Sequence, residues 1–300
     1  MIVSHGRCTF QGSIVALPTP FRDGRIDLPA LHALVDFHIE RSTDGLVVCG
    51  TTGEAPTLVD WERRAIVEAT VGRARGRVSV IAGVGTNDTR STIVHAKAAL
   101  ELGVDGLLVV TPYYNRPTQR GLDAHFSAVA EAVAAPIVLY NVPSRTGCDL
   151  QPETVAAIAA RFTHVVAVKE ALPSVERAKA LLAETPCGLL AGDDASIADF
   201  VSLGAVGAVN VIGNVAPEKV AELVRCSMPG RDSRRAAELV EWLAPIIRDL
   251  YIETNPAPVK AALAHLLPMV RDDVRLPLVT MTAANQKKLT DTLRSAGILE

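Results

Sequence analysis

The strongest constraint on the fold is a repeated alternation of short apolar runs with longer amphipathic segments. Runs of three to five residues rich in Val, Leu and Ile are typical of strands buried on both faces, as in parallel sheets. We expect these strands at residues 13–17, 45–49, 78–82, 106–110, 137–140, 165–168, 188–190 and 208–211. Between them, Ala-rich segments of helical period predict helices at residues 28–41, 61–75, 89–102, 121–133, 152–161, 174–183 and 196–203.

A strand-helix order repeated in this way predicts parallel strands joined by right-handed crossovers, and eight such strands fit one (β/α)8 TIM barrel. A short internal sequence repeat supports this order, because DGLVV at residues 44–48 recurs as DGLLV at residues 105–109. Beyond about residue 220 the pattern is helical only, with candidate helices at residues 234–251, 258–267 and 279–295. We therefore predict an α/β fold with a (β/α)8 barrel catalytic domain at residues 1–224 and a C-terminal helical domain at residues 225–300.

The composition favours a protein that acts on small molecules. Hydrophobic residues make up 49% of the 300 residues, enough for a large core, and a net charge of −3 with no Lys/Arg cluster gives no footprint for nucleic acid. No apolar run approaches the roughly 18 residues of a membrane span, and the N-terminus has no signal pattern. Five widely spaced cysteines without a C-x-x-C pair are typical of a reducing compartment. We expect a cytoplasmic protein with no membrane partner.

Neither a cofactor nor a metal is expected. The stretch at residues 83–88 begins like a dinucleotide fingerprint, but Asp88 stands where the third glycine is required. The seven histidines show no ligand spacing, and Asp193 and Asp194 have no histidine near them in the sequence. We read residues 83–88 as a strand-helix turn of the barrel.

The side chains that carry chemistry stand at strand ends. Lys169 closes the apolar run 165–168, where partial desolvation lowers an ammonium pKa and prepares the amine to attack a carbonyl. The alternative is a solvated or salt-bridged lysine followed by Glu170. Tyr140 and Thr51 follow other runs, so an amine, a phenol and a hydroxyl reach the carboxyl edge of the sheet, where such barrels place their active sites.

Neighbouring loops offer groups that bind carboxylates. The loop at residues 50–54 combines glycines with Thr51 and Thr52 and can cradle an anion, although it also fits a tight turn with a capping threonine. Arg145 presents a planar fork that matches a carboxylate, although a surface ion pair would explain it equally well. Tyr113 and Tyr114 form a pair of a kind that usually serves packing or an interface.

Six stretches resemble, in their order along the chain, the signatures of one enzyme family: residues 50–54, 111–117, 140–147, 168–170, 192–194 and 253–256. The family is 4-hydroxy-tetrahydrodipicolinate synthase, also called dihydrodipicolinate synthase, within the Schiff-base pyruvate aldolase and N-acetylneuraminate lyase superfamily. The resemblance extends over about residues 12–298.

The resemblance implies a barrel lyase of the class I aldolase type that needs no cofactor. Lys169 would form an imine with pyruvate, and the derived enamine would attack L-aspartate 4-semialdehyde to give 4-hydroxy-tetrahydrodipicolinate for lysine and diaminopimelate biosynthesis. Tyr140 would be the general acid–base, with Thr51 and Tyr114 completing a proton relay. In the family, the residue matching Tyr114 reaches into the neighbouring subunit of a tight dimer, and a homotetramer built as a dimer of dimers is expected.

The same resemblance assigns the binding groups. Thr52 and main-chain groups at Val209 would hold the pyruvate carboxylate, and Arg145 would hold the carboxylate of the aldehyde. Val209 and Asn210 depart from the isoleucine and serine usual there, which alters the pyruvate-side wall slightly. Two alternatives remain open: an N-acetylneuraminate lyase-like or keto-sugar-acid aldolase sharing Lys169 and Tyr140, and a non-catalytic regulatory barrel. Arg145 favours the synthase.

Regulation by lysine is expected to be weak or absent. In lysine-sensitive relatives a glutamate and histidines line the inhibitor pocket, together with an asparagine and a tyrosine that Asn87 and Tyr113 match. Here Ser91 stands at the glutamate position, and Asp60 and Arg63 stand at the histidine positions. The pocket therefore lacks one anionic partner for a cationic ligand.

Overall fold

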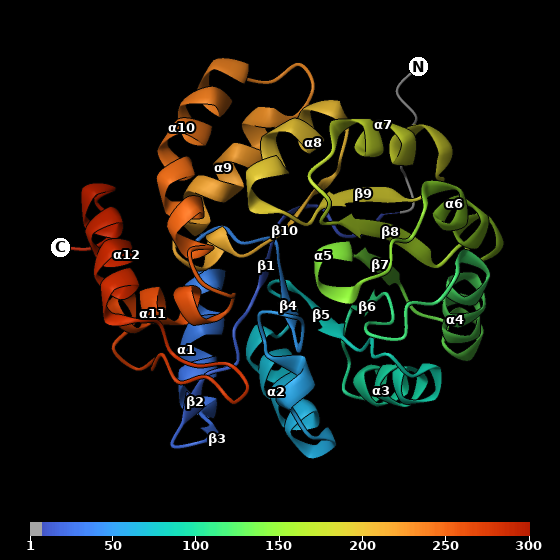
Figure 1. The fold of residues 1–300 in the computed structure, drawn as a ribbon, viewed down its shortest axis with the longest axis horizontal. Helices are drawn as coiled ribbons and strands as arrows, with labels where there is room; N and C mark the ends of the chain where they lie inside the picture. Colours follow the sequence, from blue (N-terminus) through green and yellow to red (C-terminus); the bar gives the residue numbers. More distant parts are fainter. Residues whose placement is uncertain (1–7) are drawn as a thin grey trace.

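A closed barrel of eight parallel strands forms the centre of the computed structural model, which describes residues 8–300 (Figure 1). The predicted barrel is confirmed, with each strand within a few residues of its expected position. Around the barrel the strands follow the order β1-β10-β9-β8-β7-β6-β5-β4, and a small antiparallel pair, β2 (Phe21–Arg22) and β3 (Arg25–Ile26), lies outside it. The barrel strands are β1 (Gly12–Ala16), β4 (Gly45–Val48), β5 (Ser79–Gly83), β6 (Gly106–Val110), β7 (Ile137–Asn141), β8 (Val165–Glu170), β9 (Gly188–Ala191) and β10 (Gly207–Asn210).

Helices surround the barrel as crossovers between consecutive strands (Figure 1). Several begin at a side-chain cap: Asp27, Asp88 and Ser174 accept hydrogen bonds from backbone N–H groups in the first turn of the helix that follows. The outer helices are α1 (Leu28–Ile39), α2 (Asp60–Ala74), α3 (Thr89–Glu101), α4 (Gln119–Ala132), α6 (Pro152–Arg161), α7 (Val175–Glu184), α8 (Ile197–Leu203) and α9 (Pro217–Ser227). Short helical turns, α5 (Pro143–Thr146), η1 (Ala55–Thr57), η2 (Asp194–Ser196) and η3 (Ile212–Asn214), lie in the loops.

The C-terminal region is helical, as predicted. It contains α10 (Ser233–Leu250), α11 (Ala257–Leu266) and α12 (Ala283–Ser295). The last helix begins four residues after the expected start at residue 279, because the Thr282 side chain accepts a hydrogen bond from Asn285 N and caps it there. The division between residues 224 and 225 stays a prediction, and that boundary lies inside α9.

Alternate residues along each strand enter two separate core clusters. One cluster fills the barrel interior and includes Ile14, Val47, Val138 and Val209. The other packs the strands against the helices. Any polar side chain on a strand must therefore face either the barrel mouth or the helical layer. In the described part of the chain, no helix is long and apolar enough to cross a membrane.

A fully buried ion pair joins the C-terminal region to the barrel. Lys260 of α11 pairs with Glu54, which follows β4, and also donates to Asp273 O at 2.7 Å. Arg275 N donates to the second Glu54 oxygen at 2.9 Å, and the Arg275 guanidinium pairs with Glu62 of α2. Burial lowers the pKa of Lys260. These contacts fix the loop of residues 50–54 against the segment that precedes α12.

Lys260→Met is expected to destabilise the chain by about 3–5 kcal/mol, because it leaves Glu54 buried without a counter-charge. Urea unfolding measures this, and Glu54→Gln combined with Lys260→Met should be less destabilised than Lys260→Met alone. Lys287→Met serves as the control, since Lys287 forms an exposed pair with Asp291 and its loss should change stability by less than about 1 kcal/mol. Equal effects of the two single variants would contradict the expectation.

Candidate active site

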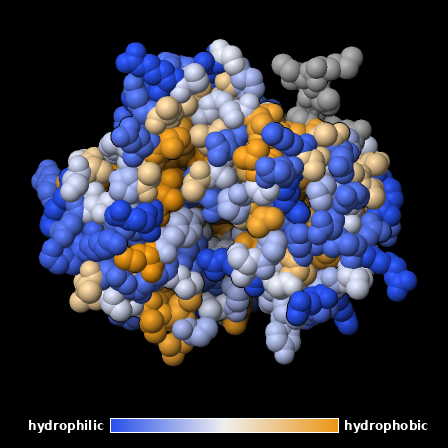
Figure 2. All heavy atoms as spheres, turned by 45° about the horizontal axis from the view of Figure 1, so that its top comes forward, coloured by the Kyte–Doolittle hydropathy of each residue, from blue (hydrophilic) through white to orange (hydrophobic). Residues whose placement is uncertain are grey.

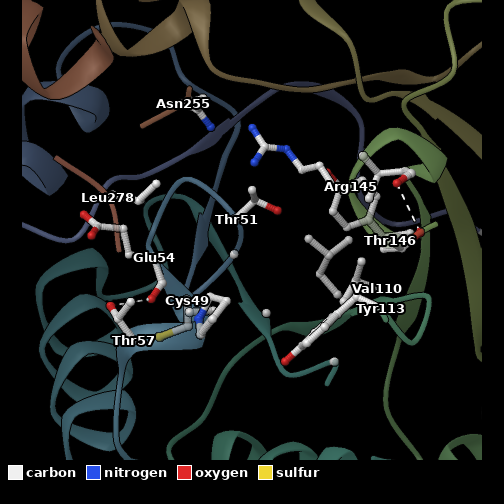
Figure 3. A pocket seen from close by; sticks show the side chains of 18 of the residues that line it. Cys49, Thr51, Glu54, Thr57, Val110, Tyr113, Arg145, Thr146, Asn255 and Leu278 are labelled. Atoms are coloured by element: carbon white, nitrogen blue, oxygen red, sulfur yellow. Dashed lines mark hydrogen bonds between the residues drawn. The ribbon is translucent and has the colours of Figure 1, made fainter. Parts of the chain in front are cut away.

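Two adjoining cavities open at the carboxyl ends of the barrel strands. The larger, about 320 Å³, is lined by Thr51, Tyr113, Tyr140, Arg145 and Asn255, among others (Figure 3). The smaller, about 210 Å³, shares Thr51, Tyr140, Arg145 and Asn255 with it and adds Thr52, Lys169 and Asp193. Because they share walls, the cavities form one site, and it contains most of the side chains singled out in the sequence.

Lys169 and Tyr140 form the centre of this site. They are directly paired on the neighbouring strands β8 and β7, and both are buried. The Lys169 ammonium lies 4.2 Å from the centroid of the Tyr140 ring, so the amine has a phenol for a neighbour. In such a cavity, the lysine amine can form an imine with a carbonyl compound, and the phenol can transfer protons during that reaction.

Gly192, in the loop after β9, makes room for the lysine stem. A Cβ atom at this position would lie 2.9 Å from Lys169 Cγ and 2.9 Å from Glu170 O. Gly192 N also donates to Glu170 O at 2.7 Å. Only glycine permits this close approach.

The loop after β4 carries the two threonines. It is bounded by Cys49 and Glu54, which both adopt left-handed backbone conformations (φ 53° and 55°), and the Glu54 carboxylate is held by Lys260. Thr52 accepts a hydrogen bond from Asn255 Nδ2 at 3.1 Å. Asn255 also lines both cavities, and its Oδ1 is buried without a hydrogen-bond partner within residues 8–300.

Asn255 is therefore a site residue that the sequence did not predict. Asn255 belongs to the stretch at residues 253–256, which is part of the family resemblance, but nothing in the sequence indicates that it contacts Thr52. The two residues are 203 positions apart and meet only in the folded chain.

Arg145 projects from α5, which follows β7. Pro143 begins this short helix and Gly147, with φ 73°, ends it. Figure 3 shows the guanidinium pointing across the cavity toward Asn255. Within residues 8–300 no carboxylate forms an ion pair with Arg145, so the surface ion pair considered from the sequence is not formed there.

Tyr114 and Val209 line neither cavity. The Tyr114 side chain is 87% exposed, and the residue has φ 72° with its N–H bonded to Thr146 O, whereas Tyr113 beside it does line the larger cavity. Val209 lies in the barrel interior near the end of β10. Asn210 donates to Ser13 Oγ and Ile14 O and accepts from Gly213 N, so this departure from the family pattern is fully hydrogen-bonded.

A pair of carboxyl groups borders the site beyond β9. Asp194 is buried and accepts hydrogen bonds from Val211 N, Ile212 N and the Tyr251 hydroxyl. Burial raises the pKa of Asp194 to about 6, and burial also raises the pKa of Asp193. No group of three or more potential metal ligands occurs in residues 8–300.

A closed parallel barrel with a lysine and a tyrosine paired at its mouth is the arrangement of a lysine-dependent lyase of the aldolase type. The chain belongs to the dihydrodipicolinate synthetase family, whose family model matches residues 9–296.

Comparisons with individual proteins agree with this family. The chain is 45% identical to the 4-hydroxy-tetrahydrodipicolinate synthase of Syntrophus aciditrophicus and 44% identical to that of Aquifex aeolicus, covering 97% and 96% of this chain and 99% and 98% of those proteins. A crystal structure of dihydrodipicolinate synthase from Aquifex aeolicus superimposes with a TM-score of 0.94 at 43% identity, covering 97% of this chain and 99% of that one. A monomeric dihydrodipicolinate synthase variant, at 38% identity and full coverage of both chains, also gives a TM-score of 0.94.

Gly192→Ala is expected to displace the Lys169 side chain, because the added methyl group overlaps both Lys169 Cγ and Glu170 O. A crystal structure should show the ammonium moved from its 4.2 Å contact with Tyr140, and unfolding should show a loss of about 1–3 kcal/mol. Gly72→Ala is the matched control, since a Cβ there meets nothing within 4 Å and the residue lies within α2. An unmoved Lys169 in the Gly192 variant would contradict the expectation.

Proposed function

We propose that this chain condenses pyruvate with L-aspartate 4-semialdehyde through a Schiff base on Lys169, giving 4-hydroxy-tetrahydrodipicolinate in lysine and diaminopimelate biosynthesis. The observation that carries the proposal is the buried Lys169 ammonium 4.2 Å from the Tyr140 ring, in a chain of this family. The reaction is that of a class I aldolase-type lyase.

The chemistry follows from the amine. Lys169 adds to the pyruvate carbonyl and loses water to form an imine, which then loses a methyl proton to become an enamine. The enamine carbon attacks the aldehyde, and the substrate amine then attacks the imine carbon and releases Lys169. The Tyr140 ring centroid lies 4.2 Å from the amine, and Tyr140 and Thr51 line the same cavity, so their hydroxyl groups are suited to carry these protons.

Binding of the two substrates is divided between two walls. Thr52, which accepts a hydrogen bond from Asn255 Nδ2, receives the pyruvate carboxylate. The contact expected from main-chain groups at Val209 stays a prediction, since Val209 lines neither cavity. Arg145 receives the carboxylate of the aldehyde, because its guanidinium faces the cavity and has no ion pair there. Three cationic side chains, Lys169, Arg145 and Arg63, line the joined cavities, which suits a site for two anionic substrates.

The proton relay would be completed by a second subunit. Tyr114 is 87% exposed and outside its own cavity, which suits a residue that enters a neighbouring site. Other hydrophobic residues also reach the surface, in separate patches on the face drawn in Figure 2. We propose a homotetramer arranged as a dimer of dimers, in the cytoplasm, although a monomeric variant exists among the relatives.

Borohydride reduction in the presence of pyruvate should attach the substrate to Lys169 alone. Lys169→Arg keeps the charge but forms no usable imine, so covalent trapping and turnover should both disappear. Intact-protein and peptide mass measurements locate the adduct. An adduct on another lysine would refute the assignment, and turnover of pyruvate with N-acetylmannosamine instead of aspartate semialdehyde would favour a sugar-acid aldolase.

Arg145→Ala should chiefly raise the KM for aspartate semialdehyde, while pyruvate trapping continues, because only the carboxylate of the semialdehyde loses its partner.

Tyr114→Phe should instead lower kcat by roughly a hundredfold or more through loss of a relay hydroxyl. Steady-state kinetics with both substrates separate the two effects. A collapse of pyruvate trapping in the Arg145 variant would show that the roles are wrongly divided.

Lysine at about 1 mM should lower the initial rate of the condensation by less than half at subsaturating pyruvate. Ser91 brings a hydroxyl in place of the missing glutamate and donates to Asp88, and one oxygen of the exposed Asp60 carboxylate is bonded to His95 Nε2 at 3.1 Å. Arg63 adds positive charge beside the cavity. Initial rates decide this, and half-inhibition below about 1 mM, a binding free energy near −4 kcal/mol, would mean that another group replaces the glutamate.

A further inference from the structure

Strand β8 contains one extra residue relative to β7. Ile137 pairs with Val165, but the next residue, Val138, pairs with Ala167, so Val166 has no partner on β7. Val166 and Ala167 both pack into the barrel-interior cluster, although they are consecutive. Only a bulge allows two consecutive strand residues to face the same side.

The bulge decides which way the catalytic lysine faces. After it, Tyr140 pairs with Lys169 and Asn141 pairs with Glu170, so Lys169 shares the cavity side with Tyr140. In an unbroken register Val138 would pair with Val166, and Lys169 would pair with Asn141 and face the helices. A slip of one residue reverses every side chain beyond it.

Glu170, directly after Lys169, is fully buried on the helix side. Its carboxylate accepts from Arg177 Nε at 2.6 Å, from Leu172 N at 2.8 Å and from Asn141 Nδ2 at 3.1 and 3.0 Å. Asn141 directly follows Tyr140, so the residues next to both members of the catalytic pair are bonded to each other. Burial raises the pKa of Glu170, and the Arg177 charge opposes that rise.

Arg177, on α7, ties this cluster to the helical layer. Its side chain is 9% exposed and also pairs with Asp149, which in turn accepts from Asn141 Nδ2 at 2.8 Å. In the unbroken register Glu170 would enter the cavity, and the Arg177 guanidinium would lose one of its two carboxylates. The buried guanidinium therefore favours the register in which Glu170 faces outward.

We infer that Glu170, held by Asn141 and Arg177, is a positioning residue that maintains the bulged register of β8 and thereby directs Lys169 toward Tyr140. The inference rests on the proposed function for the role of Lys169, but the contacts that carry it lie outside the cavity. Glu170 itself lines neither cavity.

The test uses the full-length chain and two readouts. Crystal structures of the variants locate the Lys169 ammonium relative to the Tyr140 ring, and borohydride trapping measures how fast pyruvate attaches to Lys169 in protein shown to be folded by circular dichroism. The first readout does not depend on the reaction. A wild-type chain that traps no pyruvate would thus refute the proposed function, while the position of Lys169 in the variants would still decide the inference.

Glu170→Ala should move the ammonium away from its 4.2 Å contact and slow trapping by about tenfold to a hundredfold, since small misplacements of reacting groups have effects of that size. Glu170→Gln keeps the shape and an acceptor oxygen and should trap within about threefold of the wild type. A purely structural role would lower the melting temperature and leave the trapping rate of folded protein unchanged.

A second pair of variants covers the case in which Glu170→Ala does not fold. Asn141→Asp sets a third carboxylate beside Glu170 and Asp149 and should slow trapping, whereas adding Glu170→Gln restores a donor and an acceptor across the strands and should recover most of the rate. Asp249→Asn is the control, a buried carboxylate held by Arg248 in α10, and it should not alter trapping. If Glu170→Ala keeps the contact and the wild-type rate, or if the Asn141 variant gains nothing from Glu170→Gln, the inference is wrong.

Discussion

The ion pair between Glu54 and Lys260 holds together the two parts of the chain that form the site. Neither side chain reaches solvent, so removing either one would leave the other charge buried without its partner. The pair joins the loop after β4 to α11. That loop carries Thr51 and Thr52, and the turn before α11 carries Asn255, which donates to Thr52. One buried pair therefore controls both the join between barrel and C-terminal helices and the geometry of the anion-binding wall.

The barrel imposes a second constraint, which is that every strand residue faces either the mouth and interior or the helices. At the end of β8 the two opposite charges of Lys169 and Glu170 are divided between these sides. The cation enters the cavity beside Tyr140, and the anion meets Arg177 in the helical layer. Each charge has a suitable environment only if the strand keeps its bulge, so packing and chemistry depend on the same local irregularity.

The sequence was sufficient to predict the barrel, because eight short apolar runs with helical segments between them leave few other topologies. It also placed Lys169, Tyr140 and Arg145 at the mouth, since parallel strands end on one edge. It did not reveal the bulge at Val166, because consecutive valines fit either face, and it did not reveal Asn255 or the Glu54–Lys260 pair, whose members lie more than 200 residues apart. The Tyr114 side chain is exposed and lines neither cavity, so its role in the proton relay stays a prediction from the family resemblance.

Pro277 and Leu278 belong to the C-terminal region, yet they lie at the active site. They line the larger cavity together with Asn255, although all three follow the last barrel strand, β10, by more than 40 residues in the sequence. Asn255 and Leu278 are labelled in Figure 3. The catalytic chamber therefore has a wall supplied by the helical region. We therefore expect natural variation at residues 255, 277 and 278 to affect substrate selection and water access, as variation in the barrel loops does.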